Sequence, residues 1–231
     1  VQETKAIFST SKTACCMVLA AIMISFNWGI FIWAVEAGRI VETSMGYYIN
    51  PLVNVLFGVV FLRERLDKLQ IAAVVCAVLG IGVIIVQNGG LPWVAMGLSV
   101  TFALYSLLKK IIIAQPLTSI MLETLLISPL AAGYLYYLST QGGNVYQVCE
   151  TQTMLLLAGA GVVTATPLLL FTACARKLPL KLVGFLQYIS PSITLLLGVF
   201  VYGEPFTSTI ATAFGCIWFG LLLFIWSQIR C

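Results

Sequence analysis

The chain has 231 residues, of which 61% are hydrophobic and only 9% are charged, and its formal net charge is +4. Soluble domains usually carry about 25% charged residues, so this composition excludes an ordinary water-soluble protein. A pI near 8.7 would suggest a nucleic-acid partner for a soluble protein. In a lipid environment, the basic residues are better explained by membrane orientation, and we expect no nucleic-acid partner.

Eight apolar runs are long enough to cross a bilayer. Membrane-spanning helices need about 17–25 residues, and continuous rather than alternating hydrophobicity favours helices over barrel strands. In chain order, the runs cover residues 12–35, 43–62, 69–87, 92–109, 117–138, 151–175, 181–202 and 206–227. The predicted fold class is therefore all-α: a polytopic membrane protein with eight transmembrane helices in this chain.

The basic residues predict how these helices are oriented. When the segments between the runs are assigned alternately to two sides, eleven of the twelve Lys and Arg residues fall on the side of residue 1, and only Arg39 falls on the other. Short cytoplasmic loops are enriched in Lys and Arg. The side of residue 1 is therefore predicted to be cytoplasmic, with both chain ends inside.

The two halves of the chain repeat at an offset of 140 residues. YINP at residues 48–51 meets YISP at residues 188–191, and Glu64 meets Glu204. The first three helices then correspond to the last three, five helices further on, so the copies have opposite orientations. Such inverted repeats are common in secondary transporters.

The fourth and fifth helices have no partners downstream, so their partners are expected before residue 1. The expected whole is a 5+5 protein of ten helices; a genuine eight-helix protein is the alternative. The predicted boundary between repeats lies near residues 88–91. Residues 1–138 would then hold the rest of the first repeat and two helices of the second, and residues 139–231 the last three helices.

Polar side chains inside the spans are candidates for a substrate pathway, because polar groups in hydrocarbon usually face an interior or a water-filled cavity. Two stripes occupy equivalent positions: Tyr47, Asn50, Asn54 and Gly58 in the second span, and Gln187, Ser190, Thr194 and Gly198 in the seventh. Pro51 and Pro191 interrupt the stripes, and each frees a carbonyl one turn earlier. We predict two kinked helices that line a central pathway; simple helix packing is the alternative.

Further pathway candidates flank these stripes. Asn27 and Trp28 lie at about the same membrane depth as Asn50 by helical rise, although Asn27 could equally make an interhelical hydrogen bond. Tyr188 adjoins the second stripe. Glu42 opens the second span, where an acid suits a helix N-terminus or could line the outer mouth.

Glu123 is the only acid well inside a span. A carboxyl at that position marks a proton or cation site by default, so we predict that Glu123 couples transport or contacts substrate. A protonated or snorkelling interfacial Glu is the alternative. Glu64 and Glu204 recur before the third and eighth helices and are interpreted mainly as structural caps at helix starts. Arg39 is interpreted as an ordinary loop charge; attraction of anions to the outer mouth is the alternative.

The sequence favours neither a metal site nor an enzyme. It has seven Cys without a CxxC spacing and no His, so a metal, a disulfide framework or another cofactor is not expected. Intramembrane catalysis would need a nucleophile with a base, a metal set or an acid pair. An ATP-binding motif is also missing from the sequence.

Three segments resemble the RarD branch of EamA-type transporters, in the drug/metabolite transporter superfamily. They are NWGIFIWAVEAGRIVETSMGYYINPLVNVLFGVVFLRERL at 27–66, MLETLLISPLAA at 121–132 and PLLLFTACARKLPLKLVGFLQYISPSITLLLGVFVYGEPF at 167–206. The resemblance implies a bacterial cytoplasmic (inner) membrane protein that moves a small metabolite or drug by alternating access, with ion or proton coupling. A passive channel or a non-transporting scaffold is the alternative. The expected partners are a small-molecule substrate and the lipid bilayer, and two copies could form a homodimer.

Overall fold

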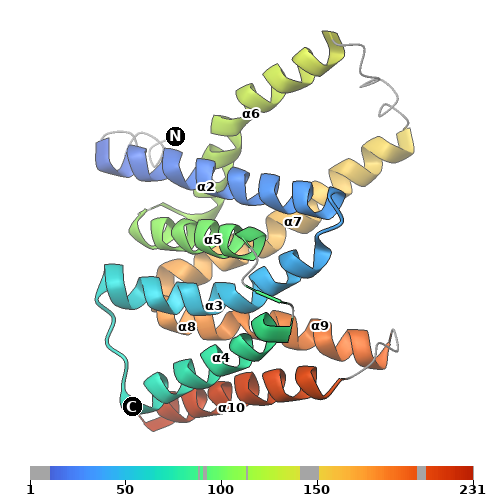
Figure 1. Cartoon of the computed structure of the whole chain (residues 1–231). Coiled ribbons are helices and arrows are strands. Elements are labelled where there is room, and N and C mark those ends of the chain that lie inside the picture. Colours follow the sequence, from blue (N-terminus) through green and yellow to red (C-terminus); the bar gives the residue numbers. More distant parts are fainter. Residues whose placement is uncertain are drawn as a thin grey trace. The chain divides into compact units, whose positions relative to one another are not determined.

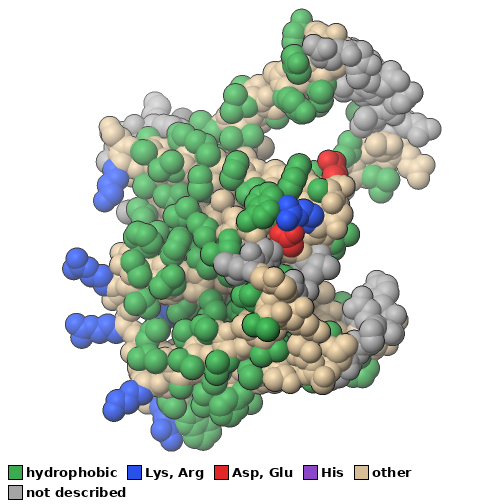
Figure 2. All heavy atoms as spheres, viewed as in Figure 1, with side chains coloured by type: hydrophobic (Ala, Val, Ile, Leu, Met, Phe, Trp, Pro, Cys, Tyr) green, Lys and Arg blue, Asp and Glu red, His purple; other side chains and the backbone are tan. Residues whose placement is uncertain are grey.

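A computed structural model describes residues 11–87, 89–90, 93–112, 114–140, 151–201 and 207–230, and Figure 1 shows its helices. Every regular element in those ranges is an α-helix, which confirms the predicted class. Eight helical segments are long and apolar enough to span a membrane, as predicted. Hydrophobic side chains cover much of the helix surfaces (Figure 2), and such surfaces suit lipid rather than water.

The helix bounds agree with the predicted spans to within a few residues. The helices are α2 (Ser11–Glu36), α3 (Ile40–Leu62), α4 (Lys68–Gln87), α5 (Trp93–Ile111), α6 (Pro116–Thr140), α7 (Thr151–Lys177), α8 (Leu180–Gln187), α9 (Ile189–Phe200) and α10 (Ser208–Arg230). The seventh predicted span is divided into α8 and α9 at Tyr188. Pro191 lies just beyond this division and cannot donate a hydrogen bond to the preceding turn. Pro51, by contrast, lies inside a continuous α3.

The chain divides into two compact units. Unit 1 comprises residues 1–25 and 108–177, and unit 2 comprises residues 26–107 and 178–231. Within unit 1, α6 packs on α7. Within unit 2, α3 packs on α8 and α4, and α4 packs on α10. Unit 2 therefore joins helices from both copies of the predicted repeat, and it contains most of the candidate residues.

The pairing of α4 with α10 is reciprocal. A Cβ atom added to Gly80 would lie 2.6 Å from the carbonyl oxygen of Ala213, and one added to Gly220 would lie 2.8 Å from that of Ala73. These two contacts exchange under the offset of 140 residues. Reciprocal contacts of this kind are the property of a two-fold interface. Small residues let the two backbones approach closely, as in other membrane helix pairs.

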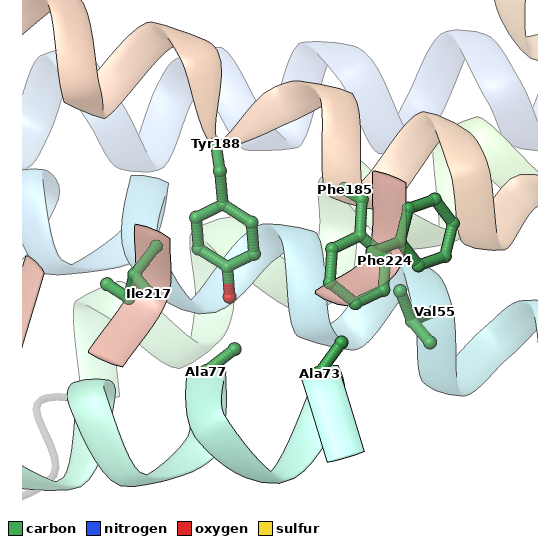
Figure 3. Close-up of a cluster of buried hydrophobic side chains, with 7 residues drawn as sticks. All are labelled: Val55, Ala73, Ala77, Phe185, Tyr188, Ile217 and Phe224. Carbon is green, nitrogen blue, oxygen red and sulfur yellow. The ribbon is translucent and has the colours of Figure 1, made fainter. Parts of the chain in front are cut away.

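Aromatic residues fill the space between the helices of unit 2. Phe185 stacks on Phe224 with ring centroids 3.9 Å apart. Both belong to a buried cluster of seven residues: Val55, Ala73, Ala77, Phe185, Tyr188, Ile217 and Phe224. Figure 3 shows that the Tyr188 hydroxyl points toward α4 at Ala77. This cluster holds α8 against the α4–α10 pair.

The segment between α3 and α4 caps α8. Arg63 adopts a left-handed conformation with a φ of 54° at the end of α3. The Glu64 carboxylate that follows accepts hydrogen bonds from the backbone N–H groups of Leu180 at 2.7 Å and Lys181 at 2.9 Å. Glu64 is therefore a cap at a helix start, as predicted, but the free N–H groups that it meets belong to α8 and not to α4, the helix that follows it. Glu204 lies outside the described residues.

Asp67 links the start of α4 to the end of α10. Its carboxylate accepts hydrogen bonds from the Ser227 hydroxyl and from the backbone N–H of Gln70. Gln70 Nε2 also donates to Ser227 Oγ at 3.0 Å, and Lys181 Nζ donates to Gln70 Oε1 at 3.0 Å. We call the end of unit 2 that carries these bonds and the Glu64 cap the basic end, after Arg63, Arg65 and Lys181.

These hydrogen bonds should make the protein sensitive to acid. The Ser227 hydroxyl, followed by the Gln70 N–H, holds the pKa of Asp67 below its ordinary value. The resulting stabilisation is present above the unfolded pKa, about 3.9, and is lost as the pH falls through the lower folded pKa. The difference in thermal midpoint between wild type and Ser227→Ala should therefore shrink as the pH falls from about 5 to about 3. A constant difference would contradict this linkage, and Asp67→Asn provides a control without the titrating group.

Candidate functional site

Three amide side chains join α3 to α8. Asn54 Nδ2 donates hydrogen bonds to Gln187 Oε1 at 2.7 Å and to Asn50 Oδ1 at 3.3 Å. Asn50 Nδ2 donates to the same Gln187 oxygen at 3.3 Å. Asn54 is 0% exposed, and its Oδ1 has no hydrogen-bond partner within the part of the chain that the structure describes. The structure thus brings together residues from both predicted stripes, and we call them the amide cluster.

Close contact between the backbones makes this cluster possible. A Cβ atom added to Gly184 would lie 2.6 Å from the carbonyl oxygen of Pro51 and 2.9 Å from Val55 Cγ2. At Gly58, which belongs to the first stripe, an added Cβ would lie 2.8 Å from the Glu64 carboxylate. Because a larger residue would hold α3 and α8 apart, these glycines allow the short Asn side chains to reach Gln187.

The other stripe residues do not join the cluster. Tyr47 is 54% exposed, and Ser190 and Thr194 are also exposed. The Thr194 hydroxyl donates to the Ser190 carbonyl of its own helix at 3.1 Å. Tyr188 is only 1% exposed and lies among the apolar side chains of Figure 3. The structure therefore places Tyr188 in the buried cluster between the helices. It leaves Tyr47, Ser190 and Thr194 exposed, and we call these three residues the accessible stripe.

Asn27 connects α2 to α5. Its Nδ2 donates hydrogen bonds to the Leu98 carbonyl and to Thr101 Oγ1, both at 2.8 Å. This is the interhelical bond that the sequence left open as the alternative to a pathway role. In the same region, Ser99 Oγ donates to the Gly46 carbonyl at 3.0 Å, so α5 is also attached to α3.

A row of aromatic rings runs from α2 to α3. Trp28 is 43% exposed, and its ring meets the edge of Phe31 at a centroid distance of 5.9 Å. Phe31 in turn meets Tyr47 edge-on at 6.4 Å. The row places two of the predicted pathway residues, Trp28 and Tyr47, on either side of Phe31. The three rings form an apolar surface that begins at Tyr47.

Glu42 and Arg39 neutralise each other at the start of α3. Arg39 Nε lies 2.6 Å from Glu42 Oε1, and the guanidinium carbon lies 4.8 Å from the centre of the Trp93 ring and 5.9 Å from that of Trp33. Such stacking on aromatic faces is favourable for Arg. Arg39 is therefore held by a carboxylate and two indoles, and Glu42 contributes little net charge to this end of the helix.

Within unit 1, Glu123 forms an ion pair with Lys109. The Lys109 ammonium donates to the Glu123 carboxylate and, at 2.6 Å, to Ser119 Oγ, and the Ser119 hydroxyl donates to Glu123 at 3.1 Å. The side chains of Lys109 and Glu123 are 1% and 5% exposed. The Glu123 carboxylate is therefore buried beside Lys109, and its role in coupling or substrate contact stays a prediction.

Lys109 is the residue that sequence reasoning missed. Its position near the end of a span assigned it to the cytoplasmic boundary, where bases need no further explanation. The signal that could have revealed it is the requirement that a carboxylate inside a membrane has a partner. Lys109 precedes Glu123 by fourteen residues across a short turn, so it was a nearby candidate for that partner.

Comparison with known proteins identifies the family. Residues 1–86 match the EamA-like transporter family. The chain is 49% identical over 216 residues to the uncharacterized transporter YojE of Bacillus subtilis, and the aligned region covers 93% of this chain and 71% of YojE. It is 40% identical over 228 residues to protein RarD of Salmonella typhi, covering 99% of this chain and 78% of that protein. It is 33% identical over 224 residues to the chloramphenicol-sensitive protein RarD of Pseudomonas aeruginosa, covering 97% and 74%. The chain belongs to the EamA-like transporter family as a RarD-like, multi-pass membrane transporter.

Proposed function

We propose that the protein is a secondary transporter that moves a small metabolite or drug by alternating access across the cytoplasmic membrane of a bacterium, with both chain ends inside. The amide cluster carries this proposal. It joins Asn54 and Gln187, which belong to equivalent spans of opposite predicted orientation. Secondary transporters bind substrate where such repeats meet. The reciprocal contacts of Gly80 and Gly220 support the same two-fold relation.

The groups along the accessible stripe favour an uncharged substrate. Tyr47, Ser190 and Thr194 offer hydroxyl groups, and Trp28 offers an aromatic surface. The Arg39–Glu42 pair adds no net charge. Side chains of these types suit molecules that combine apolar surface with a few hydrogen-bonding groups. Because one relative's name mentions chloramphenicol sensitivity, that neutral aromatic compound is a suitable first probe.

The buried pair of Lys109 and Glu123 is the proposed coupling group. Ionisable residues inside a membrane are costly and mark ion or proton pathways by default. Protonation of the Glu123 carboxylate would neutralise it and weaken its bond to Lys109. A proton gradient could therefore change the contact between Lys109 and α6 within unit 1.

Transport can be tested with the full-length protein in proteoliposomes. Candidate substrates would come from an untargeted metabolite comparison of cells with and without the protein, with chloramphenicol as an additional probe. We expect saturable uptake that depends on an imposed gradient. Uptake that rises linearly with concentration and ignores the gradient would favour the passive channel. No uptake of any candidate by correctly folded protein would contradict transport.

Gln187→Ala should lower the rate of transport by about tenfold, the equivalent of one lost hydrogen bond of about 1.4 kcal/mol. Gln187 accepts the bonds that join α3 to α8, so its loss affects the site directly. Leu186→Ala is the matched control, because Leu186 is the preceding residue and is exposed. Initial uptake rates at equal protein incorporation would be compared. Equal rates for the two variants would remove the amide cluster from the proposed site.

A further inference from the structure

The internal repeat relates the amide cluster to a second pair of residues. At the offset of 140, Asn54 corresponds to Thr194, and Gln187 corresponds to Tyr47. The hydrogen bond between Asn54 and Gln187 therefore has an equivalent between Thr194 and Tyr47. Both pairs lie on the same two spans, but the second pair lies on α9 and the first half of α3, toward the end opposite the basic end.

Only one of these two contacts is formed. Asn54 is 0% exposed, whereas Tyr47 is 54% exposed. Thr194 is exposed and its hydroxyl bonds to its own helix. Among the described helices, α3 packs closely on α8 and α4 but not on α9. In Figure 1, α8 lies alongside α3, and α9 continues from α8 away from the basic end. Among the residues that the structure describes, α3 is therefore joined to the α8–α9 span at the basic end and separate from it at the opposite end, and we call these two ends closed and open.

Close backbone packing shows the same asymmetry. Gly184 touches the carbonyl of Pro51, and the repeat makes Ser44 and Pro191 the equivalent pair. Ser44 is exposed, and its hydroxyl donates to the Ile40 carbonyl of its own helix at 3.0 Å. The Ser44 hydroxyl is thus satisfied locally, and within the described residues it makes no hydrogen bond to α9.

We propose that the two contacts exchange during transport. In the state described here, Asn54 bonds to Gln187 and the basic end is closed. In the reverse state, Tyr47 would meet Thr194 and Ser190, while Asn54 and Gln187 separate. Inverted repeats that rock about a shared site exchange equivalent contacts in this way. The inference rests on the proposed alternating-access function, and it adds the residues that close each end.

The exchange needs no new chemistry, because both sets of residues can form hydrogen bonds. The hydrogen bonds between amide side chains that are lost at one end are replaced by hydrogen bonds between the Tyr47 phenol and the hydroxyls of Ser190 and Thr194. The free energies of the two states can therefore be similar, and a gradient or a substrate can shift their populations. In the reverse state, the site would be accessible from the basic end, which is predicted to be cytoplasmic.

The α4–α10 pair predicts which state is preferred. At the basic end, Asp67, Gln70 and Ser227 form a hydrogen-bonded network. Their equivalents are Thr207, Ile210 and Gln87. Thr207 accepts a bond from the Ile210 N–H at 3.3 Å, as Asp67 does from Gln70, but the Ile210 side chain cannot bond to Gln87. The basic end has the stronger closure, so the state described here should predominate without substrate.

Paired cysteines can test the exchange. The native Cys residues of the full-length protein would be replaced first, and two double variants would then be made: Asn54→Cys/Gln187→Cys and Tyr47→Cys/Thr194→Cys. Each would be oxidised in membrane vesicles with and without a transported substrate and an imposed gradient. Leu56→Cys/Leu186→Cys is the control pair, since both leucines are exposed on the same two helices.

We expect the Asn54/Gln187 pair to cross-link readily at rest and the Tyr47/Thr194 pair to cross-link slowly. Substrate with a gradient should lower the first rate and raise the second by at least about threefold, as expected of a population shift, and the control pair should not respond. Each reduced variant should transport more slowly than wild type, because its cysteines replace residues of the proposed site. Either cross-link should stop the uptake that the reduced variant retains, and reduction should restore that lower rate. If reduced Tyr47→Cys/Thr194→Cys protein transports substrate but never cross-links, the exchange is wrong while transport stands. If the protein with native cysteines shows no uptake, the proposed function itself fails.

Discussion

Glu123→Gln should destabilise the protein by about 3–5 kcal/mol, the usual cost of removing one partner from a buried ion pair. The Lys109 side chain is only 1% exposed, so its charge would remain inside unit 1 without the Glu123 carboxylate. Ser119 would keep its own bond to Lys109 but cannot supply a negative charge. The free energy of unfolding in detergent would measure the loss, together with the yield of monodisperse protein. An unchanged unfolding free energy would show that the pair is not buried in the membrane.

A double variant separates the structural role of this pair from its role in coupling. Lys109→Met/Glu123→Leu replaces both charges with apolar side chains of similar size, and such replacements are often neutral or stabilising. We expect the double variant to recover most of the stability that Glu123→Gln loses. It should still lack gradient-driven uptake, because the proposed coupling group is gone. Gradient-driven uptake by the double variant would instead show that the pair is only structural.

Gly80→Ala and Gly220→Ala should each destabilise the protein by about 1–3 kcal/mol, because added volume in a tight contact forces the backbone to move. The new methyl groups would lie 2.6 Å and 2.8 Å from carbonyl oxygens of the facing helix. Backbone atoms cannot move aside as a flexible side chain can. Thermal midpoints in one detergent would measure both losses. Because the two contacts are reciprocal, the two losses should be similar in size.

Each helix of this pair offers its own control. Gly82 on α4 and Gly215 on α10 have no atoms within 4 Å of an added Cβ. Gly82→Ala and Gly215→Ala should therefore leave the thermal midpoint unchanged or raise it slightly, since Ala favours helix more than Gly does. If the controls lose as much stability as Gly80→Ala and Gly220→Ala, the effect is a general property of these helices and the close crossing is not its cause.

The architecture could be predicted from local features of the sequence. Continuous apolar runs determine the eight spans, because lipid requires long apolar helices, and the structure confirms them. The family could also be predicted, from long segments that resemble the RarD branch, and the comparisons confirm it. The predicted roles of Asn50, Asn54 and Gln187 in substrate transport stay predictions, although their mutual contact is now known.

The identity of the partners required the tertiary structure. Helical periodicity tells which residues share a face, but it does not tell which distant helix covers that face. Thus Glu64 caps α8 rather than α4, Asn27 bonds to α5, and Tyr188 packs in an apolar cluster. The sequence by itself determined that polar groups lie inside the membrane and that two halves repeat. Only the packing of helices more than a hundred residues apart decided that Asn54 bonds to Gln187, while the equivalent residues Tyr47 and Thr194 stay exposed.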